Sequence, residues 1–308
     1  LALMYQHTWT RPLEELGKSK NRKSRSFEDK ETYQWYKGMT EVNNCLGSKV
    51  QKIHIADREA DVYDLFFSAY EKGTDLLIRA RHKRQLSNGC SLWNHIAELP
   101  AQQIVTIQVP DKTGKKKIDV KATVRYQEVE ILRPSTSKNK YESVRLTAIE
   151  VKQTGKVNQE EQRICWKLLT TVEVKNVKDV LQCIKWYTYR WLIERFHYVL
   201  KSGTKIEELQ LKQATSLQKA ISVYSLAAFR IMQLVYQARH MPNVSCEAIL
   251  TKQQWTVLFM LIHQKNKTTK KAPTLSEAIK WIGKMGGHLG RKSDGPPCSP
   301  CRRCRREA

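Results

Sequence analysis

The sequence predicts an α/β protein that combines a sheet with helices and ends in a helical region. Three observations lead to this prediction. The alternating segment 50–56 is typical of a strand, stops at Asp57 and precedes a helical pattern, which is the order of elements in an α/β layer. Successive short strand patterns occupy 76–174. From residue 177 onward, apolar residues recur at helical spacing.

The first elements place an acidic residue at the end of a strand. Thr32–Cys45 is predicted to be helical, Val50–Ala56 to be a strand and Ala60–Ala69 to be a second helix. In open α/β sheets, the carboxyl ends of the strands carry the chemistry. Asp57 is therefore a candidate functional residue, and the alternative is an ordinary N-cap of the following helix.

The middle of the chain is predicted to be an antiparallel module inserted into the α/β chain. Polar turns separate several of its strands, which we expect at Leu76–Ala80, Ile104–Val109, Val120–Tyr126, Val129–Leu132, Val144–Val151 and Ile164–Thr171. The last third is helical. Its helices are expected at Val177–Leu200, Ser216–Tyr236, Cys246–His263 and Leu275–Lys284.

The charge of the chain favours a polyanionic partner. The 308 residues include 54 Lys and Arg against 30 Asp and Glu, which gives a formal charge of +24. Basic islands at Lys18–Lys30, Lys112–Lys117, Lys265–Lys271 and Arg302–Arg306 suit a long polyanion better than a small acidic substrate. The alternative is a merely soluble basic surface.

Composition excludes two other classes of protein. A hydrophobic fraction of 41% with 8 Trp and 12 Tyr is enough to bury a core, which excludes a generally disordered chain. No stretch approaches the roughly 18 consecutive apolar residues of a membrane span. A cytosolic protein is therefore expected.

One predicted helix carries a group of polar side chains on a single face. Along Trp186–Lys201, taken as a continuous helix at about 100° per residue, four side chains fall together, namely Tyr187, Arg190, Glu194 and Lys201. The opposite face is apolar and expected to be buried, with Leu192, Ile193, Phe196, Val199 and Leu200. The polar face is suited to phosphate groups, with the carboxylate free to hold a metal. The alternative is a solvated face with ordinary i, i+4 ion pairs.

These residues resemble a known family. Tyr187, Arg190, Glu194 and Lys201 match the Tyr-x2-Arg-x3-Glu-x6-Lys pattern, the YREK signature of the DDE transposases of bacterial insertion sequences in the IS family four group. The phrase 57–61 (Asp-Arg-Glu-Ala-Asp) resembles the segment around the second catalytic aspartate of that family. Segments 30–35 and 286–291 are also similar to it, so the resemblance covers roughly Trp9 to Pro297.

The resemblance implies a fold and a set of roles. It implies a ribonuclease-H-like core interrupted by a β-rich insertion, with Asp57 and Glu194 as ligands of Mg²⁺ in a two-metal reaction. Tyr187, Arg190 and Lys201 would hold phosphates of double-stranded DNA at the terminal repeats of a transposon, and Trp166 would stack on a flipped base. A core position on a strand is the alternative for Trp166. The implied activity is DNA cleavage and strand transfer, with a homodimer of the full-length protein and a bacterial cytoplasmic location at the nucleoid.

The same resemblance divides the chain into five parts. These are a partial catalytic core at 1–75, the β-strand insertion at 76–160, the remainder of the core with the signature helix at 161–240, a helical C-terminal region at 241–297 and a basic, Cys-rich tail at 298–308. For the tail, which contains Cys298, Cys301 and Cys304, we expect a shifted reading frame. A zinc site and a natural basic tail are the alternatives.

One acidic residue of the implied site is missing from the sequence. The family's first aspartate lies in an Asp-Thr-Thr phrase on an early strand, and this chain contains no such phrase. We therefore expect an N-terminally truncated transposase that is inactive or nearly so by itself. The rival is a DNA-binding remnant that keeps the phosphate-binding face. A weaker interpretation is an unrelated metal-dependent nuclease, which would need Asp61 or Glu59 as a further ligand. His54 and His197 receive no catalytic role.

Overall fold

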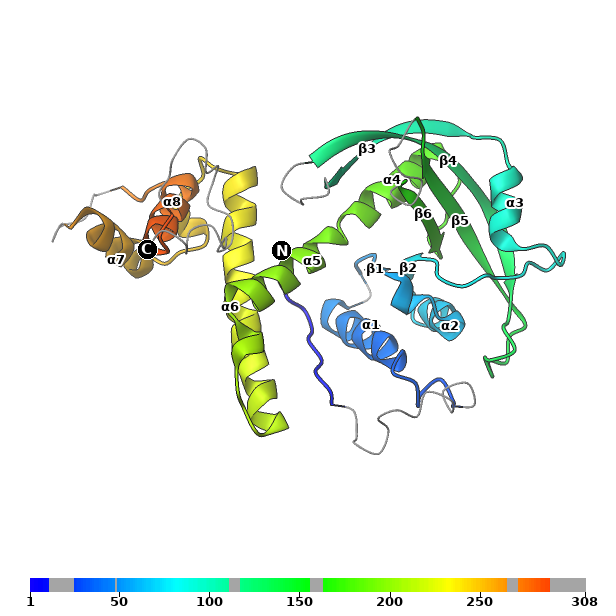
Figure 1. Cartoon of the computed structure of the whole chain (residues 1–308), viewed down its shortest axis with the longest axis horizontal. Helices are drawn as coiled ribbons and strands as arrows, with labels where there is room; N and C mark the ends of the chain where they lie inside the picture. Colours follow the sequence, from blue (N-terminus) through cyan, green and yellow to red (C-terminus); the bar gives the residue numbers. More distant parts are fainter. Residues whose placement is uncertain (11–24, 48, 111–116, 156–162, 265–270, 289–308) are drawn as a thin grey trace. The chain divides into compact units, whose positions relative to one another are not determined.

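The computed structural model describes residues 1–10, 25–47, 49–110, 117–155, 163–264 and 271–288. The chain forms two compact units. Met4–Arg190 is the first, which we call the sheet unit. Trp191–Ala308, together with Leu1–Leu3, is the second, which we call the helical unit. Figure 1 shows the strands in the first unit and the long helix α6 in the second.

The sheet unit contains one six-stranded sheet in the order β1-β2-β6-β5-β4-β3. The strands are β1 (Ile53–Ala56), β2 (Asp75–Arg79), β3 (Gln103–Pro110), β4 (Lys117–Leu132), β5 (Ser143–Gln153) and β6 (Cys165–Thr170). β1 and β2 are parallel, and every other neighbouring pair is antiparallel. The predicted α/β class is confirmed, with a mixed sheet.

The strands predicted as an inserted module, β2 among them, join the same sheet as β1. β2 pairs with β1 on one side and with β6 on the other, where Leu77 lies opposite Thr170 and Ile78 opposite Leu169. β4 is a single strand of 16 residues where two shorter strands were predicted. It stays continuous because β5 pairs with it from Ala122 to Leu132, so the polar residues Gln127 and Glu128 do not interrupt it.

Helices α1 (Tyr33–Leu46), α2 (Tyr63–Glu71) and α3 (Leu92–Glu98) pack on one face of the sheet. Figure 1 shows α1 and α2 near β1 and β2, and α3 beside β4 and β5. Helix α3 was not predicted from the sequence. Its signal was present, because Ser91 precedes Leu92, Trp93 and Ile96, which lie at helical spacing and are at most 8% exposed.

Helix α4 (Val177–Thr188) covers the opposite face. Successive side chains of β2 point to opposite faces of the sheet and so contribute to both hydrophobic cores. Leu76 and Ile78 belong to the core that contains α1–α3, whereas Leu77 belongs to the core that contains α4. Each of the three is at most 2% exposed, as expected for a strand covered on both sides. A capping box formed by Asn176 and Asp179 starts α4.

The continuous helix predicted over Val177–Leu200 is wrong. α4 ends at Thr188, a turn follows at Tyr189 and Arg190, and α5 (Trp191–Tyr198) begins next. A π-helical turn, Val199–Gly203, continues from α5. The two segments bury their apolar faces in different cores, Tyr187 with the sheet and Phe196 with α6, and this explains the interruption.

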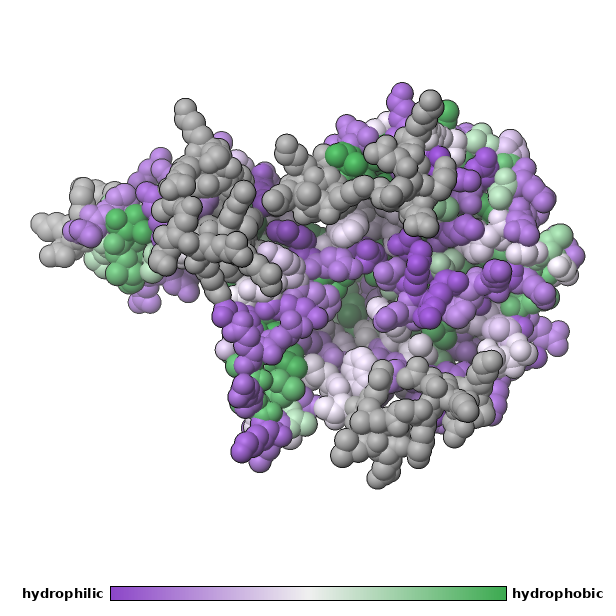
Figure 2. Space-filling model, in the orientation of Figure 1, coloured by the Kyte–Doolittle hydropathy of each residue, from purple (hydrophilic) through white to green (hydrophobic). Residues whose placement is uncertain are grey.

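The helical unit also contains α6 (Ala214–His240), α7 (Lys252–His263) and α8 (Leu275–Met285). Capping boxes at Thr251 and Thr274 start α7 and α8, consistent with their Thr-x-x-Gln and Thr-x-x-Glu sequences. Figure 2 shows hydrophobic patches over α6 and α7 on an otherwise largely hydrophilic face. The exposed apolar residues of these helices include Val223, Leu226, Val257 and Leu261.

None of the helices described in the structure is long and apolar enough to cross a membrane. The predicted Cys298, Cys301 and Cys304 tail lies outside the described residues. The four basic islands also lie wholly or largely outside them.

We predict that Ile149→Ala destabilises the sheet unit by about 2 to 5 kcal/mol, because it removes a fully buried side chain between two packed layers. Ile104→Ala is the matched control: Ile104 is 65% exposed on the edge strand β3, so we expect a loss below about 1 kcal/mol. Urea unfolding curves of the two variants measure the difference. Equal losses would contradict the described packing.

Candidate functional site

Asp57 lies at the carboxyl end of β1, directly after Ala56. Because β1 and β2 are parallel, the segments that follow the two strands leave the sheet at the same edge. Asp57 occupies the N-cap position of the short 3-10 helix Arg58–Ala60, yet its side chain makes no capping hydrogen bond. Its Oδ1 atom is buried and accepts no hydrogen bond from the described residues. The N-cap alternative therefore does not account for this carboxylate.

Arg190 provides the nearest cation to this carboxylate. Arg190 Nη1 lies 3.7 Å from Asp57 Oδ2, and the Arg190 side chain is only 10% exposed. The guanidinium carbon lies 5.9 Å from the ring centroid of Tyr187. Tyr187 in turn packs edge-on against Trp166, with ring centroids 5.3 Å apart. The structure thus brings together four predicted residues, Asp57, Trp166, Tyr187 and Arg190, in the sheet unit.

Tyr187 is buried, which corrects the prediction that it lies on a solvent-facing helix surface. It is 3% exposed and shares a stripe with Val180, Cys183 and Ile184, spaced i, i+3, i+4 and i+7. Burial raises the pKa of its phenol, while the nearby Arg190 and Arg79 guanidinium groups oppose that rise. The phenol therefore stays protonated at neutral pH and can serve as a hydrogen-bond donor.

Trp166 is buried as well, with 8% of its surface exposed. It belongs to the cluster between the sheet and α4, so the core alternative describes its place in this structure. An indole that stacks on a base needs an exposed face. Base stacking by Trp166 stays a prediction, and it would require the neighbouring side chains to move.

Glu194 and Lys201 belong to the helical unit. Glu194 lies in the first turn of α5 and is exposed, whereas Leu192 is half-buried and Ile193 is 48% exposed, so the apolar face predicted here is narrower than expected. Lys201 lies in the π-helical turn, and its Nζ pairs with Glu207 Oε1 at 3.0 Å. A shallow hollow is lined by these two residues together with His197 and Tyr198.

The predicted motif is therefore divided. Tyr187 and Arg190 end the sheet unit, and Glu194 and Lys201 lie near the start of the helical unit. The single helical face expected to carry all four does not form, because the helix is interrupted between Thr188 and Trp191.

Asp57 has the chemistry of a ligand for a hard cation. A carboxylate with one buried oxygen that accepts no hydrogen bond retains lone pairs for Mg²⁺, which prefers oxygen ligands. Among the residues that the structure describes, no group of three or more His, Cys, Asp or Glu side chains forms a metal site. Asp57 fits one ligand position, and a complete set of ligands is not assembled within the described parts of the chain.

Asp61 is a structural residue and not a spare metal ligand. Its Oδ2 accepts hydrogen bonds from the backbone N–H of Arg81 at 2.7 Å and of His82 at 2.9 Å, and its Oδ1 pairs with Arg84. Both oxygens are therefore used inside the protein. Glu59 is exposed. The further carboxylate that the unrelated nuclease interpretation requires is not supplied by Asp61.

Several basic residues at this edge were not predicted from the sequence to belong to the site. Arg79 lies close enough to Tyr187 to lower its pKa, and Arg81, His82 and Lys83 follow β2 directly. The signal was the run of basic residues from Arg79 to Arg84, interrupted only by Ala80. His54, to which no catalytic role was given, contacts Asn43 Oδ1 through its Nε2 at 3.2 Å.

One segment of the chain is similar to a known protein family. Residues 226–303 match the family model described as the Transposase Tn5 dimerisation domain. The matched segment takes in the second half of α6 together with α7 and α8, and it does not include the sheet unit. The match supports a transposase-family function, and it points to self-association through this region.

We predict that Asp61→Ala destabilises the sheet unit by about 3 to 5 kcal/mol, because it leaves the Arg84 guanidinium, only 5% exposed, without its carboxylate. Glu59→Ala, which removes an exposed carboxylate two residues away, should change the free energy of unfolding by less than about 0.5 kcal/mol. Denaturant unfolding compares the two. A loss in Asp61→Ala no larger than that in Glu59→Ala would contradict the structural role of Asp61.

Proposed function

We propose that the chain is a DNA transposase component that binds transposon ends and takes part in their metal-dependent cleavage and strand transfer. The observation that carries this proposal is the match of residues 226–303 to a transposase dimerisation domain. The sequence pattern that resembles the YREK signature of the DDE transposases also favours this proposal. The net charge of +24 supplies the electrostatic attraction that a nucleic-acid partner requires.

The edge of the sheet at Asp57 supports a phosphate-binding role. Arg190 lies beside Asp57 and near the Tyr187 ring, and Arg79 lies near the same phenol. A phosphate at the end of β1 would meet the guanidinium groups first, and the buried Tyr187 hydroxyl would donate to it only after neighbouring side chains move. Charge-assisted hydrogen bonds from arginine to phosphate are among the stronger polar contacts in proteins. We assign Tyr187, Arg190 and Lys201 to phosphates of the DNA and Trp166 to a base, as the family resemblance implies.

Asp57 and Glu194 are the proposed metal ligands. When bound, Mg²⁺ would activate water or a DNA 3′-hydroxyl for attack on a phosphodiester. The chain's own contribution is to place the Arg190 guanidinium beside Asp57 at the end of β1. A ribonuclease-H-like core is part of this proposal. It agrees with a mixed sheet that carries an acidic residue at the end of a strand next to a parallel neighbour.

A homodimer is the proposed assembly. The matched dimerisation segment includes α7 and the second half of α6, which expose apolar side chains such as Leu226 and Val257. Exposed apolar side chains in a segment that matches a dimerisation domain are candidates for contact with a second copy of the chain.

The Arg190–Asp57 pair favours a second candidate function, which is DNA binding without turnover. An arginine already neutralises the carboxylate that a metal would use. In that case the basic surface binds DNA and Asp57 serves only to orient Arg190. The two candidates differ in their need for a divalent ion.

We predict that Arg190→Ala weakens the binding of a fluorescent DNA duplex by several-fold and lowers the slope of log K against log salt by about 1, because one phosphate contact is lost. Lys178→Ala is the matched control, since it removes one positive charge from an exposed position on α4. Fluorescence anisotropy at several KCl concentrations gives both slopes. Equal slopes for the two variants would contradict a phosphate contact at Arg190.

We also predict that Mg²⁺ raises the Tm of the wild-type chain and not that of Asp57→Asn, because only the wild type offers the carboxylate. At a free Mg²⁺ concentration of about one hundred times Kd, the expected stabilisation is about 2.7 kcal/mol. Glu59→Gln, which removes an exposed carboxylate two residues away, should keep the wild-type response. A wild-type chain whose Tm ignores Mg²⁺, while its DNA binding is unchanged by a chelator, would favour the second candidate function.

A further inference from the structure

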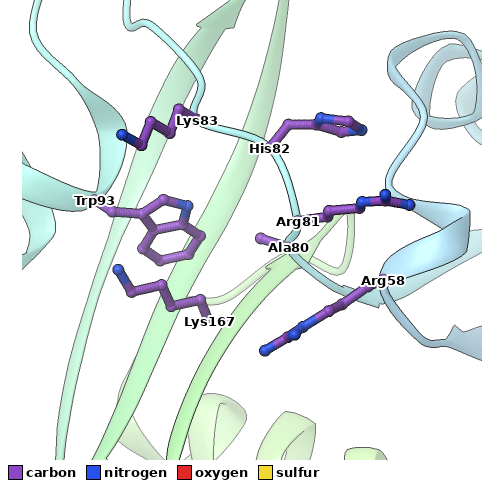
Figure 3. A pocket seen from close by; sticks show the side chains of 7 residues that line it. All are labelled: Arg58, Ala80, Arg81, His82, Lys83, Trp93 and Lys167. Atoms are coloured by element: carbon purple, nitrogen blue, oxygen red, sulfur yellow. The ribbon is translucent and has the colours of Figure 1, made fainter. Parts of the chain in front are cut away.

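A second basic site lies at the same edge of the sheet unit, on the face covered by α3. It is a hollow of about 310 Å³ lined by Arg58, Ala80, Arg81, His82, Lys83, Trp93 and Lys167. Figure 3 shows Trp93 and Lys167 on one side of it and Arg58 and Arg81 on the other. None of the lining residues is acidic. We call these residues the basic pocket.

The cations of the basic pocket have no carboxylate partner among the residues that the structure describes. Among the described residues, no ion pair joins a carboxylate to Arg58, Arg81, Lys83 or Lys167. Lys167 is held by another means: its Nζ lies over the Trp93 ring, 5.2 Å from the ring centroid. The pocket thus brings together four positive charges without a counter-ion from the described parts of the chain, and an anionic ligand would reduce their mutual repulsion.

The pocket has a rigid base. The buried Asp61 carboxylate holds the backbone at Arg81 and His82 and pairs with the buried Arg84. This anchor fixes the start of the segment that follows β2, and the side chains of Arg81 and Lys83 are left exposed. The cations are therefore presented by a backbone that is fixed in place before any ligand binds, which lowers the entropic cost of binding.

The position of the pocket indicates its ligand. Arg58 follows Asp57 directly, so the pocket adjoins the carboxylate at the end of β1. Lys167 lies on the α3 face of β6, because its neighbours Trp166 and Leu168 face the α4 cluster. Arg79, Tyr187 and Arg190 lie on the α4 side. Basic groups therefore flank the end of β1 on both faces of the sheet, as a long polyanion passing Asp57 would require.

We propose that the basic pocket binds backbone phosphates of duplex DNA, as a contact site separate from that of Tyr187 and Arg190. The inference rests on the proposed function and adds a second place where the DNA is held. Arg58 and Arg81 offer paired N–H donors that match phosphate oxygens, and Lys83 and Lys167 add point charges. Because such contacts read the phosphate backbone alone, they add affinity at every sequence.

The test compares the full chain with Arg81→Ala/Lys83→Ala, binding a fluorescent duplex of arbitrary sequence at several KCl concentrations. We expect roughly tenfold weaker binding and a salt slope lower by about 2, since two phosphate contacts are lost. Lys178→Ala/Lys185→Ala is the matched control, because it also removes two exposed charges, from α4 on the other face of the sheet. Arg58→Ala should lower the slope by about 1.

The outcomes separate this inference from the proposed function. If the wild type binds the duplex, Arg190→Ala weakens binding and the pocket variant matches its control, only the inference about the pocket is overturned. If the wild type shows no salt-dependent DNA binding, the proposed function fails as well. Inorganic phosphate, added at constant ionic strength, tests for a small-anion site: millimolar phosphate that binds the wild type and not the pocket variant, while the duplex stays bound to both with equal affinity, would overturn the assignment to DNA.

Discussion

The carboxylate of Asp61 joins the segment after β1 to the segment after β2, and the edge of the sheet depends on this link. It is fully buried and has three partners, the N–H groups of Arg81 and His82 and the guanidinium of Arg84. A buried charge of this kind is tolerated only when it is paired and hydrogen-bonded. The pairing stabilises the backbone on which Asp57, Arg58 and Arg81 lie, so the placement of the candidate site follows from a residue with no direct role in it.

Alternation along two strands then distributes the basic side chains. Arg79 on β2 points to the α4 side, where it acts on Tyr187, whereas Lys167 on β6 points to the α3 side, where it packs on Trp93. The carboxylate of Asp57 follows β1, the strand next to β2 in the sheet, and pairs with Arg190. The alternation of side chains along the strands thus forms a hydrophobic core on each face of the sheet and also distributes the positive charges between the two faces.

Much of this arrangement could be predicted from the sequence. The strand before Asp57, the helices that begin with capping boxes and the strands between 76 and 171 follow from local patterns, and the structure contains them. The break at Tyr189 and Arg190 could not be predicted in this way, because no Gly or Pro marks it. It depends on tertiary packing: Tyr187 is buried in the core between the sheet and α4, and Phe196 is buried in a separate core with α6.

The role of each basic residue could not be predicted from the sequence either. Within the run from Arg79 to Arg84, Arg84 is neutralised by Asp61, Arg79 lies beside Tyr187, and Arg81 and Lys83 line the basic pocket. These residues have the same charge and are close neighbours in the chain, so composition and spacing do not distinguish them. What distinguishes them is whether a carboxylate lies within reach and which face of the strand they occupy. Net charge therefore indicates the class of ligand, and only the fold determines which charges are available to bind it.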